Sequence, residues 1–243
     1  MTSRQARLDK FLSAALGIST KAVKPVLARG RVQVDGVVEL DAQRLVHQFS
    51  RIEYDGQVLQ ARTPSYLMLN KPAGVVSATK DSQHMTVIDV LSKSASAEFL
   101  QNDLRLRDLH IVGRLDFNST GLMLITNDGR WSRNLSAPES KIRKRYTVTL
   151  ADKVTTEMVD AFAQGMYFSF EDITTLPAEL IILGDRQAEV VLQEGRYHQI
   201  KRMFGRFQNE VLTIHRTAVG AIRLDESLAP GQFRALTQAE IDY

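Results

Sequence analysis

The sequence contains no cysteine and no apolar run that approaches the length of a membrane span. Without cysteine, a disulfide framework, a zinc site built from thiolates and a cysteine nucleophile are all excluded. The five histidines are scattered and form no HExxH-like pair, so we expect neither a bound metal ion nor a cofactor. The N-terminal residues MTSRQARLDK lack the apolar core of a signal peptide. The sequence therefore predicts a cytoplasmic protein that does not bind a membrane.

The composition is that of a globular protein, but its charge is unevenly distributed. The 243 residues, 44% hydrophobic and 24% charged, are enough for two domains, one small and one larger. The net charge is only +3, yet residues 1–31 alone carry +6, so the remaining 212 residues sum to −3. The seven cations of this segment are Arg4, Arg7, Lys10, Lys21, Lys24, Arg29 and Arg31. This asymmetry predicts an N-terminal module with a polyanionic partner, and RNA fits better than a membrane surface because no amphipathic anchor is evident.

The N-terminal module begins with two predicted helices. The apolar residues of the first recur at the spacing of one helical face: Leu8, Phe11, Leu12 and Ala15. Gly17 ends this helix, and Ser19 or Thr20 can cap a second one. Pro25 lies late in the second helix, where its ring and missing N–H predict a delayed start or a kink.

Strands complete this module. Residues 32–37 predict a hairpin with a two-residue Asp-Gly turn, and residues 52–59 predict one last strand. The runs RLDKFL (7–12) and RGRVQVDG (29–36) resemble the S4 RNA-binding domain over roughly residues 5–60. The resemblance implies that basic residues of the second helix and its C-terminal end face RNA phosphates, namely Lys21, Lys24, Arg29 and Arg31. A solvated basic face remains the alternative for any one of them.

The rest of the chain is organised around residues 110–129, HIVGRLDFNSTGLMLITNDG. The apolar strand 122–125 follows a Gly-bearing turn and is closed by residues 127–129, which can reach positive φ. Between the short apolar run 111–112 and this strand lie Arg114 and Asp116, on a support that we expect to be rigid and to face a cleft. An enzyme places a reacting group in such a position. The alternative is that Asp116 only caps a turn.

This stretch closely resembles the G-R-L-D-x-x-(S/T)-x-G-L-L-L-L-T-N-D-G signature of pseudouridine synthases, in particular the group that modifies small-subunit ribosomal RNA and its close large-subunit relatives. The resemblance implies isomerisation of a specific uridine to pseudouridine in 16S ribosomal RNA, without cofactor or metal, with Asp116 as the catalytic carboxylate. Whether Asp116 adds to the sugar or the base, or removes the C2′ proton, stays open. Arg114 is implied to fill the space left by the flipped base. Its alternative role is an ion pair with a surface acid.

Two shorter motifs carry further candidates. Residues 70–74, NKPAG, follow a predicted buried strand and resemble the N-K-P-x-G motif of the same family; Lys71 either orients RNA or closes a turn. Residues 141–145 contain four cations and precede the alternating strand 146–150. A basic run beside an aromatic can hold a nucleic-acid backbone and stack a base. The resemblance implies that Tyr146 lies over the target uracil, where it could also accept the C5 proton; the alternative is an ordinary half-buried strand tyrosine.

The segment 194–204, EGRYHQIKRMF, resembles the family's E-G-x-x-H-Q-(I/V)-(K/R)-R-M. Interpreted as a helix, it has an apolar stripe of Ile200, Met203, Phe204 and Phe207. His198, Arg202 and Arg206 recur at i, i+4 and i+8 on the opposite side, where they can meet RNA phosphate. The resemblance also implies that a cation of this motif pairs with Asp116 and lowers its pKa. Lys201 and Arg202 are both candidates for that catalytic pairing.

These patterns predict an α+β fold with an S4 domain at 1–60, a linker at 61–64 and a catalytic domain at 65–243. We expect the catalytic domain to hold a mixed, mainly antiparallel sheet, with helices near 86–91, 131–135 and 155–164, paired strands within 178–193 and strand structure over 211–222.

The expected partner is small-subunit ribosomal RNA or an assembling 30S particle, bound by a monomer. A large-subunit hairpin is the alternative target; the retained S4 domain and the absent C-terminal extension favour small-subunit RNA. The alternative of another class is a non-catalytic assembly factor. Pure binding needs cations and not a carboxylate aimed at a phosphate-rich ligand, and Asp116 with Arg114 and Tyr146 therefore argues against it.

Overall fold

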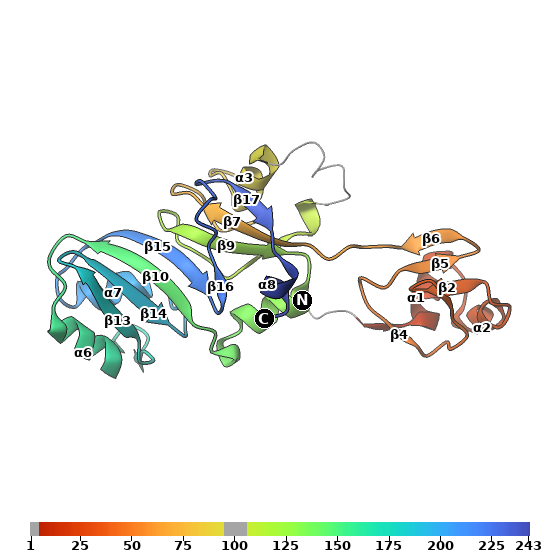
Figure 1. The fold of residues 1–243 in the computed structure, drawn as a ribbon. Coiled ribbons are helices and arrows are strands. Elements are labelled where there is room, and N and C mark those ends of the chain that lie inside the picture. Colours follow the sequence, from red (N-terminus) through yellow and green to blue (C-terminus); the bar gives the residue numbers. More distant parts are fainter. Residues whose placement is uncertain (1–4, 95–105) are drawn as a thin grey trace. The chain divides into compact units, whose positions relative to one another are not determined.

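The computed structural model describes residues 5–94 and 106–243, which fall into two compact units (Figure 1). The first unit comprises Met1–Pro64 with Asp128–Arg130, and the second comprises Ser65–Asn127 with Trp131–Tyr243. Arg4, one of the seven N-terminal cations, lies outside the described residues. The identity of the first unit as an S4 domain stays a prediction.

In the first unit, two helices cover a small antiparallel sheet of order β3-β2-β5-β6. The elements of the unit are β1 (Ala6–Arg7), α1 (Leu8–Leu16), α2 (Thr20–Ala28), β2 (Val32–Val34), β3 (Val37–Val38), β4 (Leu45–Val46), β5 (Ile52–Tyr54) and β6 (Gln57–Gln60), and β1 pairs with β4 in a second small sheet. The apolar faces predicted for the two helices are buried against the strands, as Leu8, Leu12, Val23 and Leu27 show. Gly17 ends α1 at φ 66°, as predicted. No single helix among the described residues is long and apolar enough to cross a membrane, although α1 and α2 together, bent by 104°, meet that test of length and composition.

One prediction for this unit was wrong. Residues 52–59 are not one strand, because Asp55 and Gly56 adopt φ of 49° and 78° and turn the chain into the β5–β6 hairpin. The Asp-Gly pair at 55–56 therefore required the same interpretation as the pair at 35–36, where the predicted hairpin is confirmed.

Of the two effects predicted for Pro25, the delayed start is excluded. The helix begins at Thr20, and Ser19 caps it by accepting the Ala22 N–H at 3.2 Å.

The second unit is built on a nine-stranded sheet of order β13-β14-β10-β15-β9-β7-β17, with β16 paired to β15 and β8 to β9. All pairings are antiparallel except the short parallel contact between β15 and β9, which confirms the predicted mixed, mainly antiparallel sheet. Its strands are β7 (Tyr66–Lys71), β8 (His110–Val112), β9 (Thr120–Thr126), β10 (Lys144–Leu150), β13 (Glu179–Gly184), β14 (Gln187–Leu192), β15 (Val211–Val219), β16 (Ile222–Arg223) and β17 (Phe233–Ala235).

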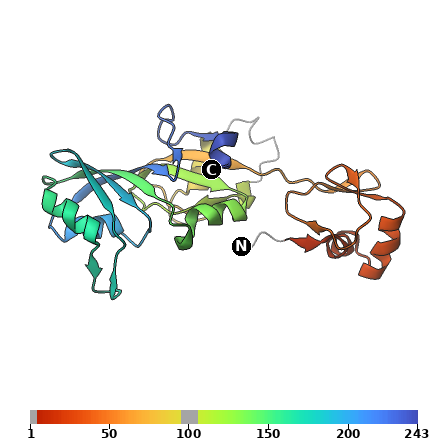
Figure 2. The ribbon, with the colours of Figure 1, turned by 60° about the horizontal axis from the view of Figure 1, so that its bottom comes forward.

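Helices and a small hairpin complete this unit. They are α3 (Val87–Ser94), η1 (Leu106–Asp108), α5 (Gly129–Ser136), η2 (Pro138–Ser140), α6 (Thr156–Gln164), α7 (Gln199–Gly205) and α8 (Gln238–Ile241), with the hairpin strands β11 (Tyr167–Phe168) and β12 (Ile173–Thr174). Figure 2 shows the β11–β12 hairpin projecting from the body of this unit. The predicted helices near 86–91, 131–135 and 155–164 correspond to α3, α5 and α6.

The central strands β7 and β9 are apolar without alternation because both faces of the sheet are covered. Leu67 and Leu69 of β7 pack into the large core that also contains residues of α6 and α7, whereas Met68 packs on the other face with Trp131 of α5. A continuous apolar run is typical of a strand buried on both sides. The strand pair β7–β9 is therefore the rigid support from which the loop between β8 and β9 extends.

Candidate active site

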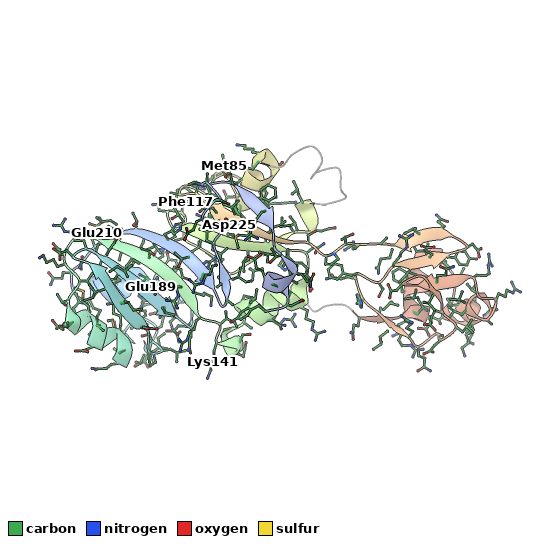
Figure 3. All side chains as sticks on the ribbon, viewed as in Figure 1. Met85, Phe117, Lys141, Glu189, Glu210 and Asp225 are labelled. Carbon is green, nitrogen blue, oxygen red and sulfur yellow. The ribbon has the colours of Figure 1, made fainter. Side chains whose placement is uncertain are left out.

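Asp116 lies in the loop between β8 and β9, and three side chains from other elements hold the main chain of that loop. The loop begins at Gly113, with φ 73°, and contains a turn in which the Ser119 N–H donates to the Asp116 carbonyl at 3.1 Å. Phe117, labelled in Figure 3, follows Asp116 and is 41% exposed. The loop as a whole is therefore a surface element, and its conformation depends on what lies beneath it.

Lys71, the last residue of β7, fastens the loop from below. Its side chain is fully buried, and Nζ donates to the carbonyls of Asp116, Phe117 and Ser119 at 3.2, 3.1 and 2.7 Å and to that of Pro72 at 3.0 Å. Burial, reinforced by the nearby charge of Arg216 and opposed by that of Asp116, lowers the pKa of Lys71 to about 8. Of the two roles predicted for Lys71, the geometry is that of turn closure, because a fully buried amine has no surface to offer RNA.

Ser77 and Arg216 hold the first half of the loop. The Ser77 hydroxyl donates to the Leu115 carbonyl at 2.6 Å and accepts the Leu115 N–H at 3.0 Å. Arg216, 1% exposed within β15, donates through Nη1 to the Arg114 carbonyl at 3.2 Å and through Nε to the Leu122 carbonyl at 2.7 Å. Every residue from Arg114 to Phe117 is thus fixed directly or through its neighbour, which sets the direction of the Asp116 side chain.

Gly121 allows this arrangement by bringing two strands unusually close. It pairs in register with Arg216 across the parallel β9–β15 contact, at φ +100°. A Cβ at this position would lie 2.3 Å from the Arg216 carbonyl oxygen. The sequence predicts this glycine in a turn before the strand, but it lies within β9, where the close approach of the two backbones requires a glycine.

The Asp116 carboxylate opens into a cleft of about 230 Å³. Its lining includes Arg114, Leu115, Asp116, Ser119, Tyr146, Leu192, Gly195, Arg196, Tyr197, His198, Gln199, Ile200 and Ile214. Tyr146 of β10 is 7% exposed and belongs to the main core, whereas the Asp116 side chain is 36% exposed. The cleft therefore combines a rigid apolar wall with one carboxylate that remains in contact with solvent.

Arg114 is exposed at the same cleft, and the three candidates Arg114, Asp116 and Tyr146 are brought together by the fold. No cysteine is available, and the described His, Asp and Glu side chains form no group of three or more that could hold a metal ion. The chemistry within reach of this site is that of a carboxylate acting as nucleophile or base beside a phenol.

His198 also reaches the carboxylate, from a position that the helical interpretation did not predict. The segment 194–198 is not helical: α7 begins at Gln199, and His198 precedes it with φ 49°, a left-handed conformation that is uncommon for a residue with a side chain. Its Nε2 lies 3.8 Å from Asp116 Oδ2, and its ring stacks on Tyr197 with centroids 3.9 Å apart. The left-handed turn directs His198 into the cleft instead of along the face of the helix.

Neither Lys201 nor Arg202 pairs with Asp116 in the described part of the chain. Arg202 forms a two-pronged ion pair with Glu171, both contacts at 2.5 Å, and its guanidinium lies 3.7 Å from the ring centroid of Phe168. Lys201 is exposed and lines a separate depression with Gly205. The side chain of this motif that does reach the carboxylate is His198.

The remaining RNA-binding candidates have differing surroundings. Lys21, Lys24 and Arg29 are exposed on α2 and at its C-terminal end. Arg31 is already engaged, because it pairs with Asp55 and lies 4.7 Å from the Tyr54 ring centroid. Arg206 is exposed and donates to the Tyr167 carbonyl at 3.2 Å.

Sequence reasoning missed the structural roles of Ser77, Glu171 and Arg216. Of these, only Arg216 gave a signal: an arginine inside the long strand pattern 211–222 is expensive to bury unless a polar partner awaits it. For Ser77 and Glu171 the sequence offers no pattern that would single them out.

Comparisons with known proteins identify relatives that match almost the whole chain. Residues 65–205 match the family described as RNA pseudouridylate synthase. The chain is 49% identical over 236 residues to the ribosomal small subunit pseudouridine synthase A of Pseudomonas aeruginosa, covering 97% of this chain and 98% of that protein. It is 39% identical to the protein of the same name from Escherichia coli, with 97% and 98% covered. A crystal structure of a pseudouridylate synthase superposes with a TM-score of 0.68 at 35% identity, covering 97% of this chain and 98% of that one.

Proposed function

The chain belongs to the RNA pseudouridylate synthase family, and from this premise we propose that it isomerises one uridine of small-subunit ribosomal RNA with Asp116 as its catalytic carboxylate. The observation that carries the residue assignment is the support of Asp116. A carboxylate on an exposed loop is held by Lys71, Ser77 and Arg216 through main-chain contacts, and it faces a cleft walled by Tyr146. Such support is expected where a reacting group must be positioned to a fraction of an ångström.

The reaction breaks the C1′–N1 bond of uridine, turns the base and forms a C1′–C5 bond, with no net change in atoms. Asp116 can act by adding to the sugar or the base or by taking the C2′ proton, and each route requires it ionised. Two basic side chains, Lys71 and Arg216, lie buried beneath its loop and hold the main chain that carries Asp116.

The target base must leave its stack to enter a cleft of this size. Base flipping costs on the order of a few kcal/mol, which contacts elsewhere must offset. Tyr146 forms a wall against which the flipped uracil packs, and the exposed Arg114 at the same cleft is placed to occupy the space that the base vacates. The exposed cations of α2 add phosphate contacts that do not depend on the flipped base.

The small-subunit target is supported by full-length relatives whose names state that substrate. A purely binding role is disfavoured, because nothing in RNA binding requires a half-exposed carboxylate fixed in the centre of the site. Mapping pseudouridines in ribosomal RNA from cells with and without this gene identifies the modified nucleotide. A pseudouridine missing only from the large-subunit RNA would move the target there.

Asp116→Asn tests the catalytic assignment. Asparagine keeps the shape and removes the charge, so pseudouridine formation should be abolished while RNA binding stays near wild type or becomes slightly tighter. The control is Asp128→Asn: Asp128 accepts the Arg130 N–H at 2.9 Å, and an asparagine oxygen can accept it equally well. Single-turnover isomerisation on a small-subunit RNA fragment, with filter binding in parallel, separates the two effects. Turnover of Asp116→Asn at the wild-type rate would refute the assignment of Asp116, whereas absence of turnover by the wild type would favour an assembly factor.

A further inference from the structure

The β11–β12 hairpin displays a phenylalanine that makes almost no contact with its own protein. Phe170, at the tip between the two strands, is 94% exposed. A single exposed apolar residue is common on proteins and by itself indicates nothing. What distinguishes Phe170 is the rigidity of the element that carries it and the neighbour to which that element is fastened.

The base of the hairpin is tightly closed. Met166 donates its N–H to the Thr175 hydroxyl at 2.9 Å, and Thr175 donates its N–H to the Met166 carbonyl at 2.9 Å. Gly165 precedes this pair at φ 80°, and a Cβ there would lie 2.4 Å from the Thr175 carbonyl oxygen. Near the tip, the Tyr167 hydroxyl donates to Asp172 at 2.8 Å and bridges the two sides.

Helix α7 clamps the side of the hairpin. Arg202 donates to Glu171 through both of its terminal nitrogens, Nη1 and Nη2, and covers the Phe168 ring. Arg206 donates to the Tyr167 carbonyl. The same helix begins just after His198, which contacts Asp116. The Arg202 N–H donates to the His198 carbonyl at 2.9 Å, which links the two residues across the first turn of the helix. The hairpin is therefore fixed to the catalytic cleft through one turn of α7.

The acids of the hairpin are offset by cations of α7. Glu171 pairs with Arg202, whereas the Asp172 carboxylate accepts a hydrogen bond from Tyr167, which leaves its charge in place. The adjoining helix presents Lys201 and Arg206, both exposed. An aromatic ring on a rigid mount beside cations suits stacking of an unpaired base, since the ring loses little conformational entropy on contact and phosphates are attracted alongside.

We propose that Phe170 stacks on an unpaired base of the RNA substrate outside the catalytic cleft, with Arg202 and Arg206 serving to position the hairpin. This inference rests on the proposed function for the identity of the ligand. It assigns to Arg202 a positioning role in place of a catalytic pairing with Asp116. Because the stacked base is not the reacting one, the contact contributes to binding and leaves the chemical step unchanged.

Three substitutions test the stacking contact: Phe170→Ala, Phe170→Leu and Phe170→Trp. Single-turnover rates on a small-subunit RNA fragment are measured against enzyme concentration, with filter binding to the same fragment. Phe170→Ala should raise the half-saturating concentration about 5- to 150-fold, the range for loss of one base–aromatic stack, with the saturating rate unchanged. Phe170→Leu should behave like alanine, because it keeps apolar area but has no π face, whereas Phe170→Trp should match wild type. The matched control is Leu183→Ala, at a residue 55% exposed near the C-terminal end of β13, which should change nothing.

Loosening the clamp gives a second measurement. In a Glu171→Gln background the hairpin is held less firmly, and Phe170→Ala should then raise the half-saturating concentration less than it does in the wild type. Equal effects in both backgrounds would show that the clamp does not position the ring. If Phe170→Ala or Phe170→Leu had the same half-saturating concentration as the wild type, base stacking would be overturned. A rise in that concentration seen only with assembled particles, and not with the RNA fragment, would also overturn it, because it would indicate a contact with protein. Absence of pseudouridine formation by the wild type would instead contradict the proposed function, while filter binding would still decide the role of Phe170.

Discussion

Lys71→Met removes the ammonium that fastens the catalytic loop while approximately preserving side-chain length. In the wild type Nζ donates to four carbonyls at 2.7 to 3.2 Å, three of which belong to the loop. An ammonium has three hydrogens, so three of these bonds can be well formed at once. Methionine takes this donor away from all four carbonyls, although those of Asp116 and Phe117 keep the N–H groups of Ser119 and Gly74 as partners.

The expected loss is large but smaller than the sum of the bonds. Each hydrogen bond to a charged group contributes roughly 1.5 to 3 kcal/mol to the free energy of unfolding. Methionine also removes the cost of desolvating the buried ammonium, and this offsets part of the lost hydrogen-bond free energy. We expect a net loss of about 2 to 4 kcal/mol in the free energy of unfolding. Loss of the support also displaces Asp116, and a shift of about 1 Å can reduce a rate roughly 100-fold.

Urea denaturation and single-turnover isomerisation at saturating enzyme measure the two effects. The stability control is Lys144→Met: burial also lowers the pKa of Lys144, but its amine makes one long hydrogen bond, to the Ile142 carbonyl at 3.4 Å. That variant should lose less than about 1 kcal/mol. A Lys71→Met protein within about 1 kcal/mol of wild type, with a saturating rate within about threefold, would refute the role assigned to Lys71.

The pKa of Lys71 adds a dependence on pH with a definite sign. Folding lowers this pKa from 10.5 to about 8, so between these values the unfolded chain holds a proton that the folded chain has released. Stability rises with pH wherever the unfolded state binds more protons. Relative to Lys71→Met, the wild type should therefore gain stability as the pH rises from 8 to 10.5, by at most roughly 3 kcal/mol. A difference that is flat or falls across this window would contradict the assignment.

Three further predictions concern the rest of the chain. The first concerns the exposed cations of the first unit, Lys21, Lys24 and Arg29. Replacing them with alanine should reduce the slope of log binding constant against log salt concentration by up to roughly 0.9 for each phosphate that is no longer neutralised. An unchanged slope would exclude these cations from the RNA interface. Gly121→Ala should cost more than about 3 kcal/mol in urea denaturation, because its Cβ would collide with Arg216, whereas Gly205→Ala, with no atom within 4 Å, should be close to neutral. Arg234 holds the pKa of Glu240 at about 2, so this pair stabilises the fold above pH 4.5 and ceases to do so as the pH falls toward 2. Melting curves from pH 7 to 2 should show Glu240→Gln losing less on acidification, by on the order of 1 kcal/mol after solvent screening, and parallel curves would contradict this.

The sequence predicted the position of the Asp116 loop because the apolar strands on both sides limit where residues 113–119 can run. The turn expected at residues 127–129 was wrong: Gly129 begins α5, and none of the three residues adopts a positive φ. Tyr146 lies on the core side of the sheet, as alternation along β10 predicts, whereas its contact with the target uracil stays a prediction. Where local pattern and long-range pairing require the same backbone, the sequence is sufficient.

The same reasoning failed where a single residue changed the direction of the chain. His198, Arg202 and Arg206 share one face only if the helix includes all three, and the left-handed conformation of His198 removes that condition. Helical periodicity contains no information on where a helix begins unless a capping residue marks it, and His198 makes no side-chain cap. The side chain of this motif that reaches Asp116 was therefore sought one turn too far along the chain.

The pairing of charges is the part of the site that no pattern in one sequence can supply. Arg202 had two acids available to it, Asp116 through the resemblance and Glu171 through the fold, and only the position of the β11–β12 hairpin decides between them. Arg216 illustrates the converse: its burial under Asp116 is compensated by carbonyls, and carbonyls are present at every residue, so sequence cannot indicate which ones are left free to accept. A buried arginine in a strand thus predicts that a nearby loop has turned its main chain inward. In this protein that loop is the one that carries the catalytic carboxylate.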